Sequence, residues 1–168
     1  GSTKTDFDLL GLDYDARMQT FDEGLRTMQT LWRGEAVNGV RLEPWPATQG
    51  GPPLLIGSWS GKQWIPRAAR DFDGWIASGA KSSFNALVSG IETYRANGGD
   101  RAIVTNIGYD LGAETTDMPD DGPFHLRCAP DVARERMSRI VELGYDDAIF
   151  VLPDRDPKRL DALRRLVD

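Results

Sequence analysis

Apolar residues along the chain alternate between short continuous runs and stretches with helical spacing. From Pro52 to Ser78 the order is an apolar run, a loop of small and polar residues, a helical stretch and a second apolar run. This order predicts one strand–helix–strand unit. The same alternation continues toward the carboxyl terminus, and it predicts four parallel strands, near Leu54, Trp75, Val104 and Phe150.

Helices are expected between and around these strands, because apolar residues recur there at steps of three and four. The predicted helices cover about residues 13–33, 65–72, 82–96, 130–143 and 157–167. Asp13 or Asp15 is expected to cap the first helix, and Gly34 to end it. The fold class is therefore α/β, with a parallel sheet covered by helices. Periodicity does not distinguish a small open sheet from half of an eight-stranded barrel.

Residues 35–51 interrupt this alternation. Asn38-Gly39 predicts a type I′ hairpin turn, and a proline-rich irregular segment follows it. We interpret this stretch as a hairpin and loop insertion within a single domain of residues 1–168, rather than as a domain boundary.

The composition limits which kinds of molecule the chain can bind. The formal charge is −6 at pH 7, which argues against binding to nucleic acid or to an anionic membrane surface. The chain has no apolar run of transmembrane length. Because its first residues lead into an acidic, mixed stretch, we expect no signal peptide. One cysteine, Cys128, and one histidine, His125, do not make a zinc site within one chain. We expect a cytoplasmic protein with no nucleic-acid, membrane or metal partner.

The loop after the first strand is the main candidate for a binding site. It consists of Gly57, Ser58, Trp59, Ser60, Gly61 and Lys62. Glycines let a ligand approach the backbone, hydroxyl and amide groups donate hydrogen bonds, and the following helix adds a favourable dipole for a phosphate. Pro66 places the helix start near Gln63 or Trp64, which moves the dipole away from Ser60. An ordinary strand–helix turn stays the alternative.

Other candidates are weaker. Gly79, after the second strand, would give a cofactor room, and Lys81 would reach an acidic group, although a solvated loop is an equal alternative. Asn106 would bind a ring edge if it faces inward, but a shift of one residue in the strand reverses its face. His125 and Cys128 lack the partners that catalysis needs, so we expect structural roles for both.

Aromatic and acidic residues suggest no further site. Trp32, Trp64 and Trp75 are expected in the core, whereas Trp59 lies in the candidate loop itself. The acidic run from Glu114 to Asp121 matches no calcium-binding spacing, so we interpret it as a solvated loop.

Four stretches, in this order and spacing, are similar to one family. They are Arg17…Asp22-Glu23…Leu25…Leu31-Trp32, then Gly34-Glu35-Ala36-Val37 with its return to Pro52-Pro53, then Leu54 to Trp75, and then Leu143-Gly144-Tyr145-Asp146-Asp147. Together they resemble the luciferase-like monooxygenases, which are (β/α)-barrel enzymes that use FMN or the deazaflavin coenzyme F-420. The likeness extends over nearly the whole chain.

The resemblance implies a flavin- or deazaflavin-dependent oxidoreductase or monooxygenase that acts on a small molecule. It implies that the loop from Gly57 to Lys62 holds the flavin phosphate, with Gly79 nearby, and that this chain is the carboxyl-terminal half of a (β/α)8 barrel. Catalysis would then need the amino-terminal half. The resemblance names no catalytic residue.

A half-barrel has unpaired edge strands, so we expect either a homodimer or association with an amino-terminal half. Two other interpretations stay open. One is a non-catalytic half-barrel that folds by self-association and binds at most a cofactor phosphate. The other is an open four-stranded α/β sheet that binds a nucleotide as a monomer.

Overall fold

The computed structural model describes residues 3–59, 62–154 and 156–167. The chain divides into two compact units, Gly1–Pro52 and Pro53–Asp168, and each is described by itself. The first unit contains α1 (Lys4–Leu9), α2 (Arg17–Trp32) and the 3-10 helix η1 (Pro46–Thr48). The sequence pattern did not predict α1, which is short and is capped by the side chain of Thr3.

The long helix α2 confirms the predicted first helix, but its predicted cap was wrong. Ala16 occupies the N-cap position and provides no side-chain hydrogen bond. Asp13 instead accepts a hydrogen bond from the Asp15 amide at 2.8 Å, so this carboxylate stabilises the preceding turn. At the other end Gly34 has a φ of 76°, which confirms it as the residue that ends the helix.

The predicted hairpin turn is confirmed. Asn38 and Gly39 both have positive φ, 50° and 77°, as a type I′ turn requires. Val37 and Val40 exchange backbone hydrogen bonds of 2.8 and 2.9 Å across the turn.

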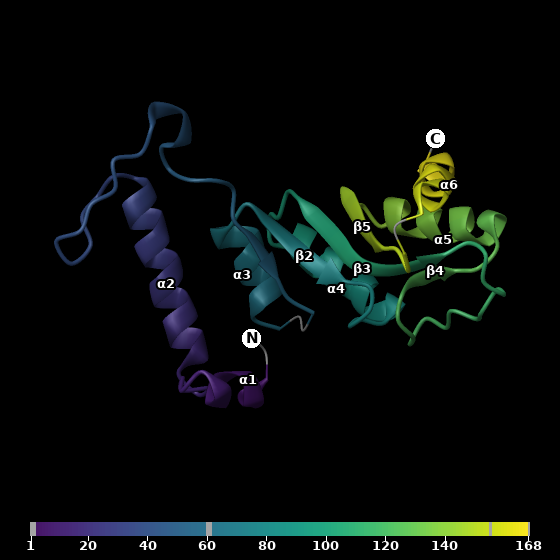
Figure 1. Cartoon of the computed structure of the whole chain (residues 1–168), viewed down its shortest axis with the longest axis horizontal. Helices are drawn as coiled ribbons and strands as arrows, with labels where there is room; N and C mark the ends of the chain where they lie inside the picture. Colours follow the sequence, from purple (N-terminus) through teal and green to yellow (C-terminus); the bar gives the residue numbers. More distant parts are fainter. Residues whose placement is uncertain (1–2, 60–61, 155, 168) are drawn as a thin grey trace. The chain divides into compact units, whose positions relative to one another are not determined.

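The second unit contains five strands and four helices among its described residues (Figure 1). In chain order they are β1 (Leu55–Gly57), α3 (Trp64–Asp71), β2 (Gly74–Ser78), α4 (Phe84–Ala96), β3 (Ala102–Asp110), β4 (His125–Arg127), α5 (Pro130–Glu142), β5 (Asp147–Val151) and α6 (Pro157–Val167). The strand pairings are parallel. The prediction of an α/β half-barrel with about four parallel strands is therefore confirmed, with β4 as a short addition.

The sheet is built around β3. β1 pairs with β2 and β2 with β3, whereas both β4 and β5 pair with β3. Gly108 of β3 is in register with Val151 of β5 and with His125 of β4, so β4 and β5 lie on opposite edges of β3. β4 thus continues the edge that β2 occupies, beyond the point where β2 ends.

The helices cover one face of the sheet. Trp75 of β2 is 1% exposed, and its ring centroid lies 5.6 Å from that of Tyr94 on α4 and 5.9 Å from that of Tyr145. Tyr109 of β3 donates its hydroxyl to the carbonyl of Arg159 on α6 at 3.0 Å. Burial of these large rings against the helices removes apolar surface from water and supplies the core of this unit.

The other face of the sheet, which we call the inner face, is turned away from α3–α6. The register places the following residues on it: Leu55, Gly57, Gly74, Ile76, Ser78, Ile103, Thr105, Gly108, Asp110, His125, Arg127, Asp147, Ile149 and Val151. Most of them are apolar or small. Two of them on β5, Ile149 and Val151, are 52% and 53% exposed.

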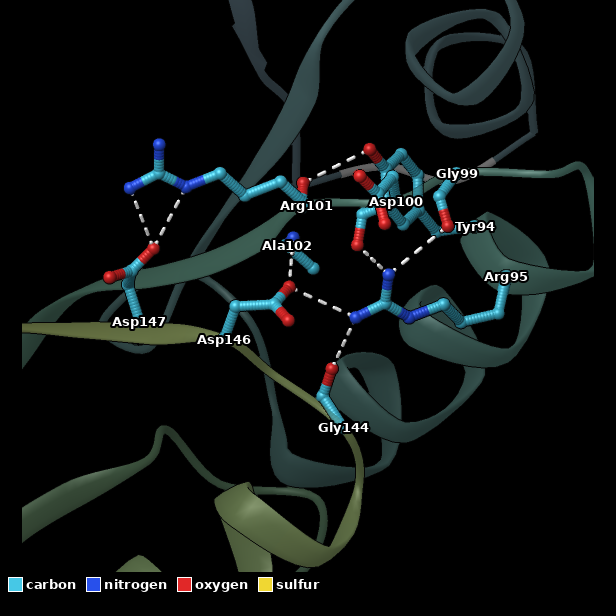
Figure 2. A network of polar contacts seen from close by, with 9 residues as sticks. All are labelled: Tyr94, Arg95, Gly99, Asp100, Arg101, Ala102, Gly144, Asp146 and Asp147. Carbon is cyan, nitrogen blue, oxygen red and sulfur yellow. Dashed lines mark hydrogen bonds and ion pairs between the residues drawn. The ribbon is translucent and has the colours of Figure 1, made fainter.

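A polar network joins the loops at the amino ends of β3 and β5 (Figure 2). The Asp146 carboxylate accepts hydrogen bonds from the Ala102 amide at 2.7 Å and from Arg95 at 3.0 Å. Arg95 also donates to backbone carbonyls, among them those of Gly144 at 2.6 Å and Gly99 at 3.1 Å. These contacts stabilise the loops at the amino ends of the strands, which is the end of a (β/α) barrel that ordinarily serves stability rather than ligand binding.

Candidate functional site

The candidate loop begins at the carboxyl end of β1, where the structure holds its first residues firmly. The Ser58 amide donates to the carbonyl of Ile76 on β2 at 3.1 Å. The Ser58 carbonyl accepts a hydrogen bond of 3.0 Å from the indole nitrogen of Trp75. Ser58 is 9% exposed. Both polar groups of its backbone are therefore fixed by the neighbouring strand.

Trp75 is a positioning residue that the sequence assigned only to the core. Its ring packs beneath the helices while its indole N–H reaches the loop across the sheet. Buried indole groups usually find such a partner. From the sequence one could therefore expect a hydrogen bond from a buried Trp75, but not which carbonyl accepts it.

Around this fixed residue the loop is open. A Cβ added to Gly57 would meet no atom within 4 Å, so the inner face at the end of β1 is accessible to a ligand. Trp59 is 54% exposed, and Lys62 is also exposed. Ser60 and Gly61, the other two residues of the predicted phosphate loop, lie outside the described residues.

The start of α3 agrees with the prediction made from Pro66. Gln63 is the N-cap residue and α3 begins at Trp64, so Pro66 is the third residue of the helix. Proline has no N–H, and the first turn of α3 therefore offers one amide fewer to an anion than an ordinary helix does. The dipole begins at Trp64 rather than at Ser60.

Gly79 lies beside the loop, but its surroundings are tightly packed. Its amide donates to Thr105 at 2.7 Å, and its carbonyl accepts from Phe124 at 3.0 Å. A Cβ at this position would come within 3.2 Å of the Phe124 carbonyl oxygen. Close packing of the sheet thus favours a glycine here, and the backbone polar groups of Gly79 already have partners. Lys81 is exposed.

Asn106 lies at an irregularity of β3. The register with β5 shifts between Val104 and Ile107, and Asn106 has a φ of 56°. Its side-chain nitrogen is 3.3 Å from the hydroxyl of Ser78. Bulges commonly redirect a side chain next to a binding site, and this one brings an exposed amide to Ser78 at the carboxyl end of the inner face.

His125 and Cys128 occupy structural positions. The Nδ1 atom of His125 accepts from the Arg127 amide at 3.2 Å. Burial lowers the pKa of His125, and the charges of Arg136 and Arg127 lower it further, which favours the neutral imidazole. Cys128 is fully buried, and burial raises the pKa of its thiol, which disfavours the reactive thiolate.

The remaining aromatic and acidic candidates make contacts within the chain. Trp32 lies against Gly51, where a Cβ would come 2.3 Å from its ring, and Trp64 stacks with the Arg67 guanidinium at 4.7 Å. In the acidic segment, Asp120 pairs with Arg139 at 2.7 Å. Within the described residues there is no group of three or more His, Cys, Asp or Glu side chains that could hold a metal ion.

The described helices include none that is long and apolar enough to cross a membrane.

A family model described as luciferase-like monooxygenase matches residues 1–115. The chain belongs to the luciferase-like monooxygenase family. The match covers α1, α2, the hairpin, the candidate loop and the sheet as far as β3, so the resemblance that the sequence motifs indicated is confirmed.

Comparison of the structure with solved proteins supports the same fold. The crystal structure of the monooxygenase RslO1 from Streptomyces bottropensis matches with a TM-score of 0.67 at 14% sequence identity. The match covers 96% of this chain and 63% of that enzyme, so the chain spans less than two thirds of the enzyme's length. No curated protein sequence matches the chain.

Proposed function

We propose that the chain forms the phosphate-binding half of a flavin- or deazaflavin-dependent oxidoreductase or monooxygenase. The observation that carries this proposal is the Ser58 backbone, fixed by Trp75 and β2 beside the open position of Gly57. The Ser58 amide and carbonyl are themselves occupied, so Ser58 would act by fixing where the loop begins, and the adjacent glycine would let a phosphate approach the backbone that follows. When bound, FMN or coenzyme F-420 would supply the hydride or oxygen chemistry.

The residues of the chain would bind and orient that group. Gly57 would let the phosphate approach the backbone, and Lys62 would contribute an exposed positive charge. Trp59 would cover an apolar part of the ligand. Ser58, Ser60, Gly61 and Gly79 complete the proposed cofactor-binding set. Of these, Gly79 would act by shaping the sheet, since its own amide and carbonyl are bonded to Thr105 and Phe124.

Titration of the chain with FMN and with coenzyme F-420, followed by quenching of their fluorescence, tests this proposal without an activity assay. We expect saturable binding of one of the two cofactors. Lys62→Met should weaken it, whereas Lys81→Met, which removes an exposed lysine after β2, should have a smaller effect. Absence of binding by both cofactors would contradict the proposal.

A second candidate is a non-catalytic half-barrel that associates with a copy of itself. The exposure of Ile149 and Val151 on β5 favours it, because such apolar side chains on an edge strand promote pairing. The solution mass at micromolar concentration distinguishes a dimer from a monomer, and a monomer would contradict self-association.

Activity separates the two candidates further. Consumption of a reductant by this chain in the presence of cofactor would favour the enzyme. A stable dimer that binds cofactor phosphate without turnover would favour the non-catalytic half-barrel. Association with an amino-terminal half that completes the barrel is the third arrangement, and it is tested by adding that half and measuring restored turnover.

A further inference from the structure

Arg127 lies on the inner face at the carboxyl end of the sheet. Its neighbour Leu126 is fully buried and is in register with Tyr109 on the helix-covered face, so Arg127 points to the opposite side. A Cβ added to Gly108 would lie 3.6 Å from Nε and 3.8 Å from Nη2 of Arg127. The guanidinium therefore lies over Gly108 of β3, where the missing side chain leaves room for it.

The Arg127 side chain is exposed. Its guanidinium makes no hydrogen bond or ion pair within the part of the chain that the structure describes. Asp110 is in register with Arg127 on the neighbouring strand. However, its carboxylate is bound by Arg159 at 2.7 Å and by the Gly112 amide at 3.1 Å. The five N–H donors of Arg127 thus remain available to a ligand.

The surroundings of Arg127 add positive charge. Arg136 is 7% exposed and donates to two backbone carbonyls, those of Thr116 at 2.6 Å and His125 at 3.2 Å. No ion pair of Arg136 occurs among the residues described. The charges of Arg136 and Arg127 both act on His125. The charge of Arg127 also acts on the Asp110 carboxylate, which Arg159 holds. An anionic ligand at this corner would therefore meet two arginines that have no ion pair among the described residues.

An apolar surface adjoins this corner. Val151 is in register with Gly108 on the edge of β3 opposite β4, and neighbouring strands lie about 4.8 Å apart. Ile149 precedes it on the same face, and both side chains are more than half exposed. An unpaired guanidinium next to exposed aliphatic side chains is complementary to a molecule with an anionic head and an apolar body.

We propose that Arg127 binds the carboxylate of an apolar acid whose hydrocarbon part lies on Ile149 and Val151. The inference deepens the proposed function, because this acid would be the class of substrate presented to the cofactor from the same end of the sheet. Guanidinium groups bind carboxylates through two parallel hydrogen bonds, and Gly108 leaves the space in which that pair forms.

The direct test is calorimetric titration of the full chain with octanoate, with octanol as the uncharged probe. We expect octanoate to bind more tightly than octanol. Arg127→Met should weaken octanoate binding by about tenfold or more, and Arg127→Lys should restore part of the affinity. Arg164→Met removes the same charge from the exposed surface of α6 and should leave octanoate binding unchanged.

Gly108→Val provides a second variant that keeps the charge. Its side chain would enter the space beside the guanidinium, so octanoate binding should weaken although Arg127 is present. Circular dichroism of each variant confirms that it is folded. No binding of octanoate to the wild type, or equal binding to wild type and Arg127→Met, would overturn the proposal.

Titration with FMN distinguishes a substrate carboxylate from the cofactor phosphate as the bound anion. We expect Arg127→Met to bind FMN as the wild type does. A loss of FMN affinity in Arg127→Met would assign the guanidinium to the cofactor and overturn the proposal. Failure of FMN binding in every variant, with octanoate binding intact, would instead count against the proposed function alone.

Discussion

The indole nitrogen of Trp75 donates a hydrogen bond of 3.0 Å to the carbonyl of Ser58. This bond connects the buried side of β2 with the first residues of the candidate phosphate loop. It gives a residue of the core a direct part in shaping the loop.

Trp75→Phe should therefore affect both stability and binding. The substitution keeps an aromatic ring in the core but leaves the buried Ser58 carbonyl without its donor, which costs about 1–3 kcal/mol of unfolding free energy. Urea denaturation measures this loss, and FMN titration measures the effect on the loop. Trp45→Phe is the control, because Trp45 is 79% exposed. An equal effect of both substitutions would show that the hydrogen bond contributes nothing.

Asn106 has left-handed backbone geometry, with a φ of 56°, so its substitutions should differ in a characteristic order. Asn106→Gly should leave stability nearly unchanged, since glycine adopts this conformation freely. Asn106→Ala should lose about 1 kcal/mol, and Asn106→Val should lose more. Denaturation midpoints of the three variants give the order. If valine were tolerated as well as glycine, the bulge would have to be absent in solution.

Gly90 and Gly24 are both helical glycines, but they have opposite surroundings. A Cβ on Gly90 would come 2.6 Å from the Trp75 ring, whereas one on Gly24 would meet nothing within 4 Å. Gly90→Ala should therefore destabilise the chain by about 1–3 kcal/mol through overpacking. Gly24→Ala should stabilise it by about 0.5–1 kcal/mol. Thermal unfolding of the two variants tests the pair, and a shift of the same sign in both would contradict the packing described here.

Asp146 should make stability depend on pH in the acid range. Burial acts to raise the pKa of this carboxyl, but the Ala102 amide and Arg95 outweigh it, so the pKa is lowered overall (Figure 2). A lowered pKa in the folded state gives stability that is present above the unfolded-state pKa, about 3.9. That contribution is lost as the pH falls through the folded-state value.

Asp146→Asn removes this charge but keeps an oxygen that can accept from Ala102. It should therefore cost about 1 kcal/mol at pH 7 and progressively less as the pH falls below about 4. Urea denaturation of both proteins at pH 7 and pH 3 measures the difference. A cost that is the same at both pH values would show that the charge of Asp146 contributes nothing to stability.

The sequence predicted four of the five strands and all four helices described in the second unit, because their apolar spacing is clear. It also predicted the shifted start of α3, because Pro66 limits where a helix can begin. It did not predict α1, whose six residues are too few to show a period. The predicted N-cap of α2 was also wrong, since two aspartates precede that helix and neither occupies the N-cap position.

The contacts of the candidate site were harder to predict from the sequence. The loop after β1 was found from its glycines, but its hydrogen bond to Trp75 joins residues 17 positions apart. The bulge at Asn106 was not visible, because strand patterns do not show where an extra residue enters. Arg127 was overlooked because its significance depends on Gly108, on a different strand. Such relationships arise only when the strands are in register.

Comparison of FMN with riboflavin tests the central claim, that the loop after β1 binds a cofactor phosphate. The two ligands differ by that phosphate alone, and Gly57→Val places a branched side chain in the open position beside the loop, where an added Cβ meets no atom within 4 Å. We predict that the wild type binds FMN at least about tenfold more tightly than riboflavin, and that Gly57→Val abolishes this preference. Equal affinity of the wild type for the two ligands would contradict the claim.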